Sequence, residues 1–284
     1  MTSDPLTSAP PPLPLSAADI VRAGELIYRW SGMVFGESKR YYMERRIAER
    51  MKRHGLASPS AYLDFAASDR QEREALINAF TINETYFYRE EHQLAALARD
   101  ILPDVVSRKQ PGQLVRIWSM PCSTGEEAYS IAIWLLENWP LVDAYNVEIV
   151  ASDIDTDALA RAAEGYFSER SLARLPDVLK NRYFEPEHEH RRRIIQDLRE
   201  SVQFTPANII DPQSMAKLGT FDVILCRNLL IYFDDTARQR AADNLYDSLN
   251  PGGYICLGHS ESMGRISDRF TLARLPDAIV YRRP

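Results

Sequence analysis

The chain has 284 residues, of which 45% are apolar, so it can bury one large core or two smaller ones. Its formal net charge of -6 argues against a nucleic-acid groove formed by overall basicity, and no apolar run approaches the roughly 20 residues of a membrane-spanning helix. Three cysteines, Cys122, Cys226 and Cys256, without C-x-x-C spacing support neither a disulfide framework nor a zinc ribbon. The N-terminus lacks the features of a secretory signal, so we expect a cytoplasmic protein without membrane insertion.

The first part of the chain is predicted to be helical after a flexible tail. Residues 1–15 contain five of the 17 prolines and almost no charge, which is typical of a segment with little to bury. From Ser16, apolar residues follow at helical spacing until Gly32, and further helix starts are indicated near residues 38, 58 and 69. We predict an N-terminal helical domain over residues 16–90, which includes a polar and aromatic junction segment at 81–90.

The second part alternates strand and helix patterns. A linker helix is predicted within 91–112, and the domain at 113–284 opens with a strand, a small-residue loop and a helix. Further strands are predicted at 147–153, 221–226, 254–258 and 278–281, which gives a parallel sheet with an antiparallel end. Pairing of residues 182–184 with 202–204 would make a small antiparallel β-subdomain, inserted at about 182–206.

The loop after the first strand of this domain indicates the kind of ligand. It contains neither G-x-G-x-x-G nor G-K-[ST], which disfavours a pyrophosphate. A nucleoside without phosphates, such as S-adenosylmethionine, needs less glycine at this turn. Asp153 ends the next strand, where a carboxylate would hold a ribose. Glu126 and Glu127 begin the helix, where acids favour the helix dipole, and one of them is a candidate to face the ligand's ammonium group.

Four motifs carry a resemblance to a known family. They are TINETYFYRE at 81–90, SMPCSTGEEAYSIA at 119–132, ASDIDTDALARA at 151–162 and FDVILCRNLLIYF at 221–233. In this order and spacing they resemble the CheR chemotaxis methyltransferases, which methylate glutamates of bacterial chemoreceptors with S-adenosylmethionine, over about residues 16–282. The resemblance implies an α/β fold: a Rossmann-like methyltransferase domain with an inserted small antiparallel β-subdomain, preceded by an all-α N-terminal domain.

The resemblance also implies the residues of the site. Arg89 would lie near the transferred methyl group and Tyr232 over the reaction centre, so these are the candidate catalytic residues. Cofactor contacts are implied for Asn83, Thr85, Arg89, Glu127, Asp153, Asn208, Ile209, Asn228 and Leu229. The product would be S-adenosylhomocysteine, and no metal is implied.

The chemistry of a glutamate acceptor agrees with this set of residues. A glutamate side chain has a pKa of about 4.3, so at neutral pH it is already nucleophilic and needs no general base. We therefore expect a protein-glutamate O-methyltransferase, with a non-catalytic module that binds S-adenosylmethionine or S-adenosylhomocysteine as the alternative. His188, Glu189 and His190 fit a solvated turn better than a metal site, because no further His or Cys stands close in sequence.

A basic helix is the strongest signal for a partner. Arg46, Arg50 and Arg53 share one face at i, i+4 and i+7 spacing, which is typical either of a solvated face or of a docking surface. The resemblance makes this face a docking surface for the methylation helices of receptors. In some relatives the inserted hairpin binds a receptor's C-terminal pentapeptide, and the loop of those relatives tends to be longer and to contain glycine. The loop here, within residues 185–203, is short and has no glycine, so we expect no tether. We also expect a monomer without a nucleic-acid partner.

Overall fold

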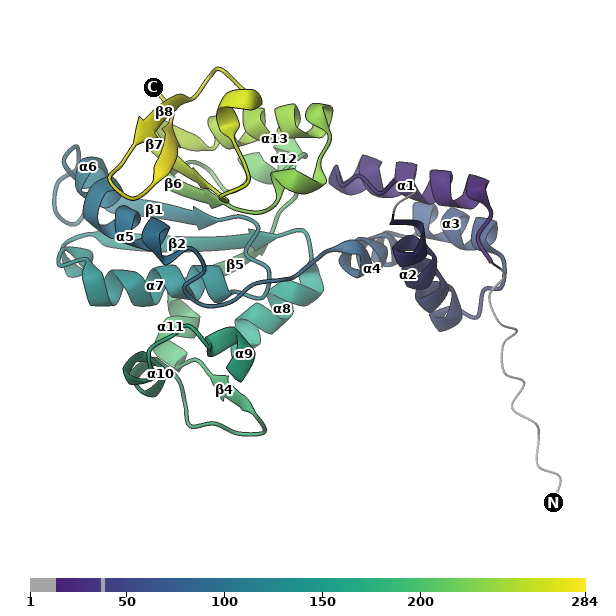
Figure 1. The fold of residues 1–284 in the computed structure, drawn as a ribbon, viewed down its shortest axis with the longest axis horizontal. Coiled ribbons are helices and arrows are strands. Elements are labelled where there is room, and N and C mark those ends of the chain that lie inside the picture. The colour runs from purple at the N-terminus through teal and green to yellow at the C-terminus, as the bar shows by residue number, and fades with distance from the viewer. Residues whose placement is uncertain (1–13, 37–38) are drawn as a thin grey trace. The chain divides into compact units, whose positions relative to one another are not determined.

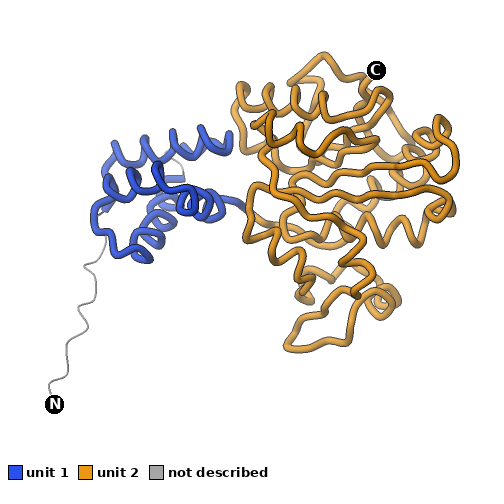
Figure 2. Tube along the Cα trace, turned by 180° about the vertical axis from the view of Figure 1, so that it is seen from behind, with its two compact units in different colours: residues 1–82 blue, residues 83–284 orange. Residues whose placement is uncertain are grey.

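A computed structural model describes residues 14–36 and 39–284. It divides into two compact units, residues 1–82 and 83–284, coloured separately in Figure 2. The division falls at 82/83 rather than at the expected 90/91, so the junction segment belongs to the second unit from Asn83 onward. The predicted tail at 1–15 lies outside the described residues except for its last two, of which Leu15 is buried.

The first unit contains four helices among its described residues, close to the predicted positions. Ser16 and Asp19 form a capping box at the first helix, which ends at Gly32 with a left-handed φ of 76°, a conformation that suits glycine. Ser58 and Asp69 cap the third and fourth helices through their side chains, as the sequence indicates. The helices are α1 (Ala17–Ser31), α2 (Arg40–Arg53), α3 (Pro59–Ser68) and α4 (Arg70–Phe80) (Figure 1).

A buried carboxylate holds three of these helices together. Glu72 of α4 is only 3% exposed and accepts hydrogen bonds from Arg50 of α2 and from the Tyr62 hydroxyl of α3, the latter at 2.6 Å. The His54 ring lies 2.6 Å from the same carboxylate. Burial alone would raise the pKa of Glu72, but the bonds from Arg50 and Tyr62 bring it below its usual value. Arg50 therefore faces the interior of this unit.

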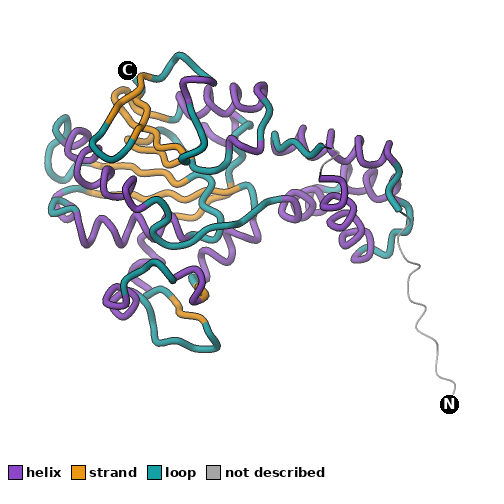
Figure 3. The backbone as a smooth tube through the Cα atoms, viewed as in Figure 1, coloured by secondary structure: helices purple, strands orange, loops and turns teal. Residues whose placement is uncertain are grey.

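The second unit begins with the junction segment and a continuous run of helix. This run consists of α5 (Glu91–Ala96), a π-helical turn η2 (Leu97–Ile101) and α6 (Leu102–Val106). The helix predicted within 91–112 is present and spans residues 91–106. Figure 3 shows the loops on either side of this helix in teal.

A seven-stranded sheet forms the centre of the second unit. Its strand order is β5-β2-β1-β6-β7-β9-β8, parallel from β5 to β7, with β9 antiparallel to both of its neighbours. This confirms the predicted parallel sheet with an antiparallel end. The strands are β1 (Leu114–Ser119), β2 (Asn146–Asp153), β5 (Val202–Pro206), β6 (Phe221–Cys226), β7 (Leu249–Leu257), β8 (Thr271–Arg274) and β9 (Ile279–Arg282).

The central strands are buried on both faces, as expected of a parallel sheet covered by helices. Every residue of β6 is buried, and Trp118 of β1 stacks on Phe221 of β6 with ring centroids 4.6 Å apart. The covering elements are α7 (Glu126–Asn138), α8 (Thr156–Glu164), α12 (Pro212–Ala216) and α13 (Asp235–Asp247), with short 3-10 turns η3 (Val142–Ala144), η4 (Leu230–Tyr232) and η5 (Met263–Arg265).

The inserted β-subdomain exists, but its strands differ from the predicted ones. Its two-stranded antiparallel sheet pairs β3 (Tyr166–Ser168) with β4 (Arg191–Arg193). The segment predicted as its second strand, at 202–204, is instead β5, which pairs in parallel with β2 at the edge of the main sheet. The sequence of β5, VQFTP, alternates apolar and polar residues over 202–205, which is also the pattern of a hairpin strand. The subdomain also holds α9 (Glu169–Leu172), α10 (Asp177–Tyr183) and α11 (Gln196–Ser201).

Candidate active site

The order of the strands places a crevice at one edge of the main sheet. From β1 the chain continues to β2 and β5 on one side, whereas β6 and β7 follow on the other side. In open α/β sheets, ligands bind beyond the carboxyl ends of the strands where the order reverses in this way. The segments that follow β1, β2, β5 and β6 hold most of the predicted cofactor residues. The junction segment supplies the rest.

The loop after β1 is built around one glycine. Gly125 has a φ of 95°, and a Cβ added there would lie 2.9 Å from the Cβ of Ala162 and 3.2 Å from the ring of Tyr129. No other residue fits this position without displacing α8 or α7. The tight turn predicted between strand and helix is confirmed, and it brings the N-terminus of α7 to the crevice.

Asp153 lies at the end of β2 and is 4% exposed. Its carboxylate accepts backbone hydrogen bonds from Ser123 at 2.8 Å and from Asp155 at 2.9 Å. Burial raises the pKa of Asp153 to about 6, even though these hydrogen bonds favour the charged form. A carboxylate has about four acceptor positions, so this side chain retains capacity for a further donor such as a ribose hydroxyl.

Asn83 connects the junction segment to the loops after β1 and β2. Its amide donates to the Asp155 carboxylate at 2.7 Å, and its amide oxygen accepts from the Ser123 hydroxyl at 2.9 Å. Asp155 uses its other oxygen to cap α8. The first residue of the second unit therefore lies beside Asp153, where the resemblance places a cofactor contact.

The two acids at the start of α7 have different surroundings. Glu126 is buried, and its carboxylate accepts from the hydroxyls of Thr124 at 2.6 Å and Ser171 at 2.7 Å. Glu127 accepts from the Ser119 hydroxyl at 2.7 Å and forms an ion pair with Arg227 at 3.0 Å. Burial raises the pKa of Glu127, and Arg227 opposes that rise. Glu126 is therefore tied to α9 through Ser171, whereas Glu127 is tied through Arg227 to the segment that follows β6.

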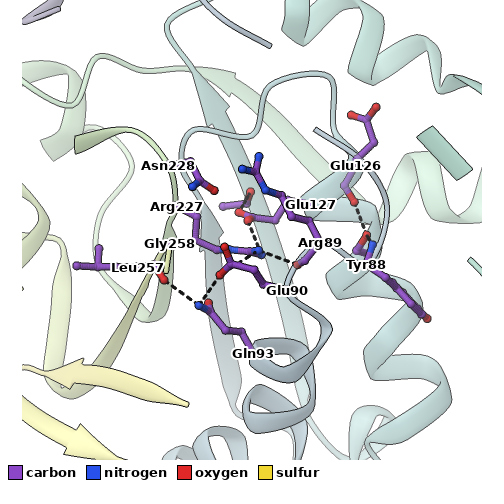
Figure 4. Close-up of polar contacts among 12 residues, drawn as sticks. Tyr88, Arg89, Glu90, Gln93, Glu126, Glu127, Arg227, Asn228, Leu257 and Gly258 are labelled. Carbon is purple, nitrogen blue, oxygen red and sulfur yellow. Dashed lines mark hydrogen bonds and ion pairs between the residues drawn. The ribbon is translucent and has the colours of Figure 1, made fainter. Parts of the chain in front are cut away.

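Arg227 lies at the centre of the polar network in Figure 4. Its side chain is 3% exposed, and besides pairing with Glu127 it donates to the backbone carbonyl of Arg89 at 2.7 Å and lies 3.5 Å from the Glu90 carboxylate. Sequence reasoning passed over this residue. The signal was present, since Arg227 is a cation directly after a fully buried strand, inside a motif already noted for its other residues.

The junction segment is fixed at a second point by Gln93. Its amide nitrogen donates to the Glu90 carboxylate and to the Leu257 carbonyl at the end of β7, both at 2.8 Å. Glu90 itself has a left-handed φ of 55°. The backbone around Arg89 is therefore held against the ends of β6 and β7, and the Arg89 charge lies close enough to Glu127 to favour its ionised form.

Asn228 and Leu229 follow β6 in a turn that Glu261 fixes. The Glu261 carboxylate accepts from the backbone of Asn228 at 2.7 Å, of Leu230 at 2.7 Å and of Gly258 at 2.9 Å. Asn228 adopts a left-handed φ of 58°. The segment at 258–262 therefore supports this turn, and its glutamate is a second residue that the sequence did not reveal.

The other predicted residues lie near the crevice with different contacts. Tyr232 ends η4, one turn after Asn228, and is partly buried. Asn208 follows β5 and its side chain accepts from the Ile210 backbone at 3.2 Å, while Ile209 is 3% exposed. Thr85 is partly buried.

Arg46, Arg50 and Arg53, the predicted docking residues, lie on α2 of the first unit. Arg53 is exposed, and the Arg46 side chain is 29% exposed beside the ring of Tyr42. Arg50 differs from both, because its guanidinium is paired with buried Glu72. The three arginines therefore have the spacing of one helical face, but Arg50 does not present its charge on that face.

Comparison with known proteins identifies the family. Residues 83–279 match the model for the "CheR methyltransferase, SAM binding domain" and residues 18–81 match that for the "CheR methyltransferase, all-alpha domain". The chain belongs to the CheR methyltransferase family. It is 46% identical over 273 residues to Chemotaxis protein methyltransferase 2 of Vibrio cholerae, covering 95% of this chain and 94% of that protein. It is 36% identical to the Chemotaxis protein methyltransferase of Escherichia coli, covering 92% and 90%.

The crevice of this CheR family member fits S-adenosylmethionine. Asp153 offers acceptor capacity for a ribose, Glu127 offers a carboxylate for an ammonium group, and Gly125 allows the tight turn that brings the start of α7 beside them. Within residues 14–36 and 39–284, no cluster of His, Cys, Asp or Glu could hold a metal ion. No helix in the described parts of the chain is long and apolar enough to cross a membrane.

Proposed function

We propose that this CheR family member transfers a methyl group from S-adenosylmethionine to glutamate carboxylates of chemoreceptors, which gives methyl esters. The names of the relatives support the receptor substrate, and they give no support to the non-catalytic alternative. The observation that carries the proposal is the position of Arg89. Its backbone is held by Arg227 next to Glu127, so a carboxylate-binding cation lies beside the cofactor crevice.

The reaction needs orientation more than proton transfer. The cofactor, when bound, supplies a methyl group on a positively charged sulfur, and the acceptor forms an O–CH3 bond as the S–CH3 bond breaks. The electron pair remains on sulfur, and the positive sulfur and negative carboxylate are both neutralised without a proton. Proximity and orientation can lower such a barrier by about 7 to 11 kcal/mol.

The residues divide this work between two ends of the crevice. Asp153 and Asn83 fix the nucleoside end, with Asn208 and Ile209 beside the base, and Glu127 holds the ammonium group. Arg89 receives the incoming carboxylate, and Tyr232 orients it through its hydroxyl. Thr85, Asn228 and Leu229 complete the contacts with the cofactor.

The role of Arg89 can be tested with a matched control. Arg89 and Arg174 both place their guanidinium groups over the ring of Tyr86, at 5.8 and 5.0 Å. We expect R89A to lose methyl transfer while keeping cofactor affinity, measured by calorimetry, and R174A to keep both. Equal loss of turnover and affinity in R89A would make Arg89 a cofactor residue instead, and unchanged turnover would remove it from the site.

We propose that receptor methylation helices dock on α2 through Arg46 and Arg53. Both lie on the face predicted from the sequence, whereas Arg50 supports that face from inside through Glu72. The R53E variant should raise the KM for a receptor cytoplasmic fragment without changing the Kd of the cofactor. R29E, a reversal at an exposed position of α1, is the matched control. An equal KM in the two variants would contradict docking on α2.

We propose further that the protein acts in the cytoplasm as a monomer, without a receptor tether. The turn between α10 and β4 is short, and its hydrogen bonds close it on itself between His188 and Arg191. Deleting the last five residues of a tether-bearing receptor should leave the KM unchanged, and a rise would reveal a tether. Sedimentation velocity gives the oligomeric state.

A further inference from the structure

A groove of about 470 Å³ opens beyond the carboxyl ends of β6 and β7. Leu230 and Ile231 of η4 form one side of it, and the first turns of α13 and residues 260–266 form the others. Tyr232, the candidate catalytic tyrosine, is the next residue of η4. One side of the groove is therefore formed by the same short helical turn that carries Tyr232.

The walls of this groove are fixed before any ligand binds. Glu261 accepts backbone hydrogen bonds from Asn228 and Leu230, and the Arg238 guanidinium donates to the Leu230 carbonyl at 3.0 Å. On the opposite side, the hydroxyls of Ser262 and Tyr281 lie 3.1 Å apart. A groove held by hydrogen bonds in this way loses little conformational entropy when a partner enters it.

The charged side chains that line the groove are two acids, Asp235 and Glu261, and two arginines, Arg238 and Arg265. The Glu261 carboxylate is occupied by three backbone N–H groups, and Asp235, which is 99% exposed, is paired with Arg238 at 3.1 Å. Arg265 is exposed and forms no ion pair with any residue that the structure describes. Beside this cation, Ile231 leaves 44% of its surface exposed. The combination suits a segment that carries both carboxylates and apolar side chains.

We propose that this groove binds the receptor segment next to the methylated glutamate, with an acidic side chain on Arg265 and an apolar one on Ile231. The inference rests on the proposed function, because it takes the acceptor to be a glutamate of an acidic protein helix. A helix repeats its surface every three or four residues, so a segment whose glutamate lies at Tyr232 places a neighbouring side chain over η4. The groove thus contributes to the choice of which glutamate is methylated.

The test uses the full-length protein and a receptor cytoplasmic fragment with tritiated S-adenosylmethionine. We expect R265E to raise the KM for the fragment about tenfold, because reversal turns one attraction into a repulsion. The kcat at saturating fragment and the calorimetric Kd of the cofactor should stay at wild-type values. R274E makes the same charge change at an exposed position of β8 and should leave the KM unchanged. I231S should raise the KM by a smaller factor.

The outcomes separate this inference from the proposed function. If the wild-type protein methylates the fragment but R265E and R274E have equal KM values, the groove does not bind the receptor. A fall in kcat of R265E with an unchanged KM also overturns the inference, since the residue would then act on the reaction step. If the wild-type protein methylates no receptor fragment, the proposed function fails, and the inference that rests on it fails as well.

Discussion

Replacing Arg227 by methionine should destabilise the second unit strongly. The change keeps the length of the side chain but leaves Glu127 and Glu90, whose side chains are 13% and 11% exposed, without their shared cation. Breaking a buried ion pair by removing one partner costs about 3 to 5 kcal/mol, which is a large part of the 5 to 15 kcal/mol typical of a domain. The Arg89 carbonyl also loses its donor.

Urea unfolding followed by tryptophan fluorescence measures this loss. Trp118, Trp134 and Trp139 belong to the second unit and only Trp30 to the first, so the signal reports mainly on the unit that contains Arg227. The R227K variant retains a charge but not the planar fork, and should fall between wild type and R227M.

The dependence on pH distinguishes an electrostatic loss from lost packing. Without Arg227, burial is no longer opposed and the pKa of Glu127, already raised, rises further. A raised pKa means that the folded state holds its proton more tightly than the unfolded state, so stability increases as pH falls. The deficit of R227M should therefore shrink between pH 7 and pH 5. A variant as stable as wild type at pH 7, or a deficit independent of pH, would refute this reasoning.

Three further predictions follow from other contacts. Asp153, whose pKa is about 6, should accept a ribose hydroxyl best when it is ionised. Calorimetry should therefore show a cofactor affinity about tenfold weaker at pH 5 than at pH 7.5, and the D153N variant should show no such dependence on pH. The G125A variant should weaken cofactor binding in the same assay and lower the melting temperature, because its new Cβ meets Ala162 at 2.9 Å and its φ of 95° is strained. Y62F should cost the first unit about 1 to 3 kcal/mol in urea unfolding, since a hydrogen bond to buried, ionised Glu72 is lost, and an unchanged midpoint would contradict this.

The parts of the fold that local sequence signals specify were predicted well. Helix starts at Ser16, Ser58 and Asp69 follow from side chains that hydrogen-bond within a few residues, and the buried strand at 221–226 follows from its continuous apolar run. The pairing of β5 with β2 was missed, because the partner of an edge strand depends on contacts distant in sequence.

The residues of the candidate site also fall into those that local sequence indicates and those whose roles depend on distant contacts. Asp153 and Glu127 are recognisable from their places at a strand end and a helix start. Arg227 and Glu261 were not recognised, since their roles depend on carbonyl and amide groups brought from 138 and 33 positions away. Arg50 was misjudged for the opposite reason: helical spacing shows which residues share a face, but not that Glu72 of another helix lies against it.

The division at 82/83 has a consequence for how such proteins diverge. The segment that carries Asn83 and Arg89 is fastened by Arg227 and Gln93 to the unit that contains the sheet, although it directly follows the last helix of the other unit. The residues proposed to transfer the methyl group therefore all lie in one unit. Under the proposed docking on α2, substitutions in the helical unit would change the choice of receptor without altering the residues proposed for methyl transfer.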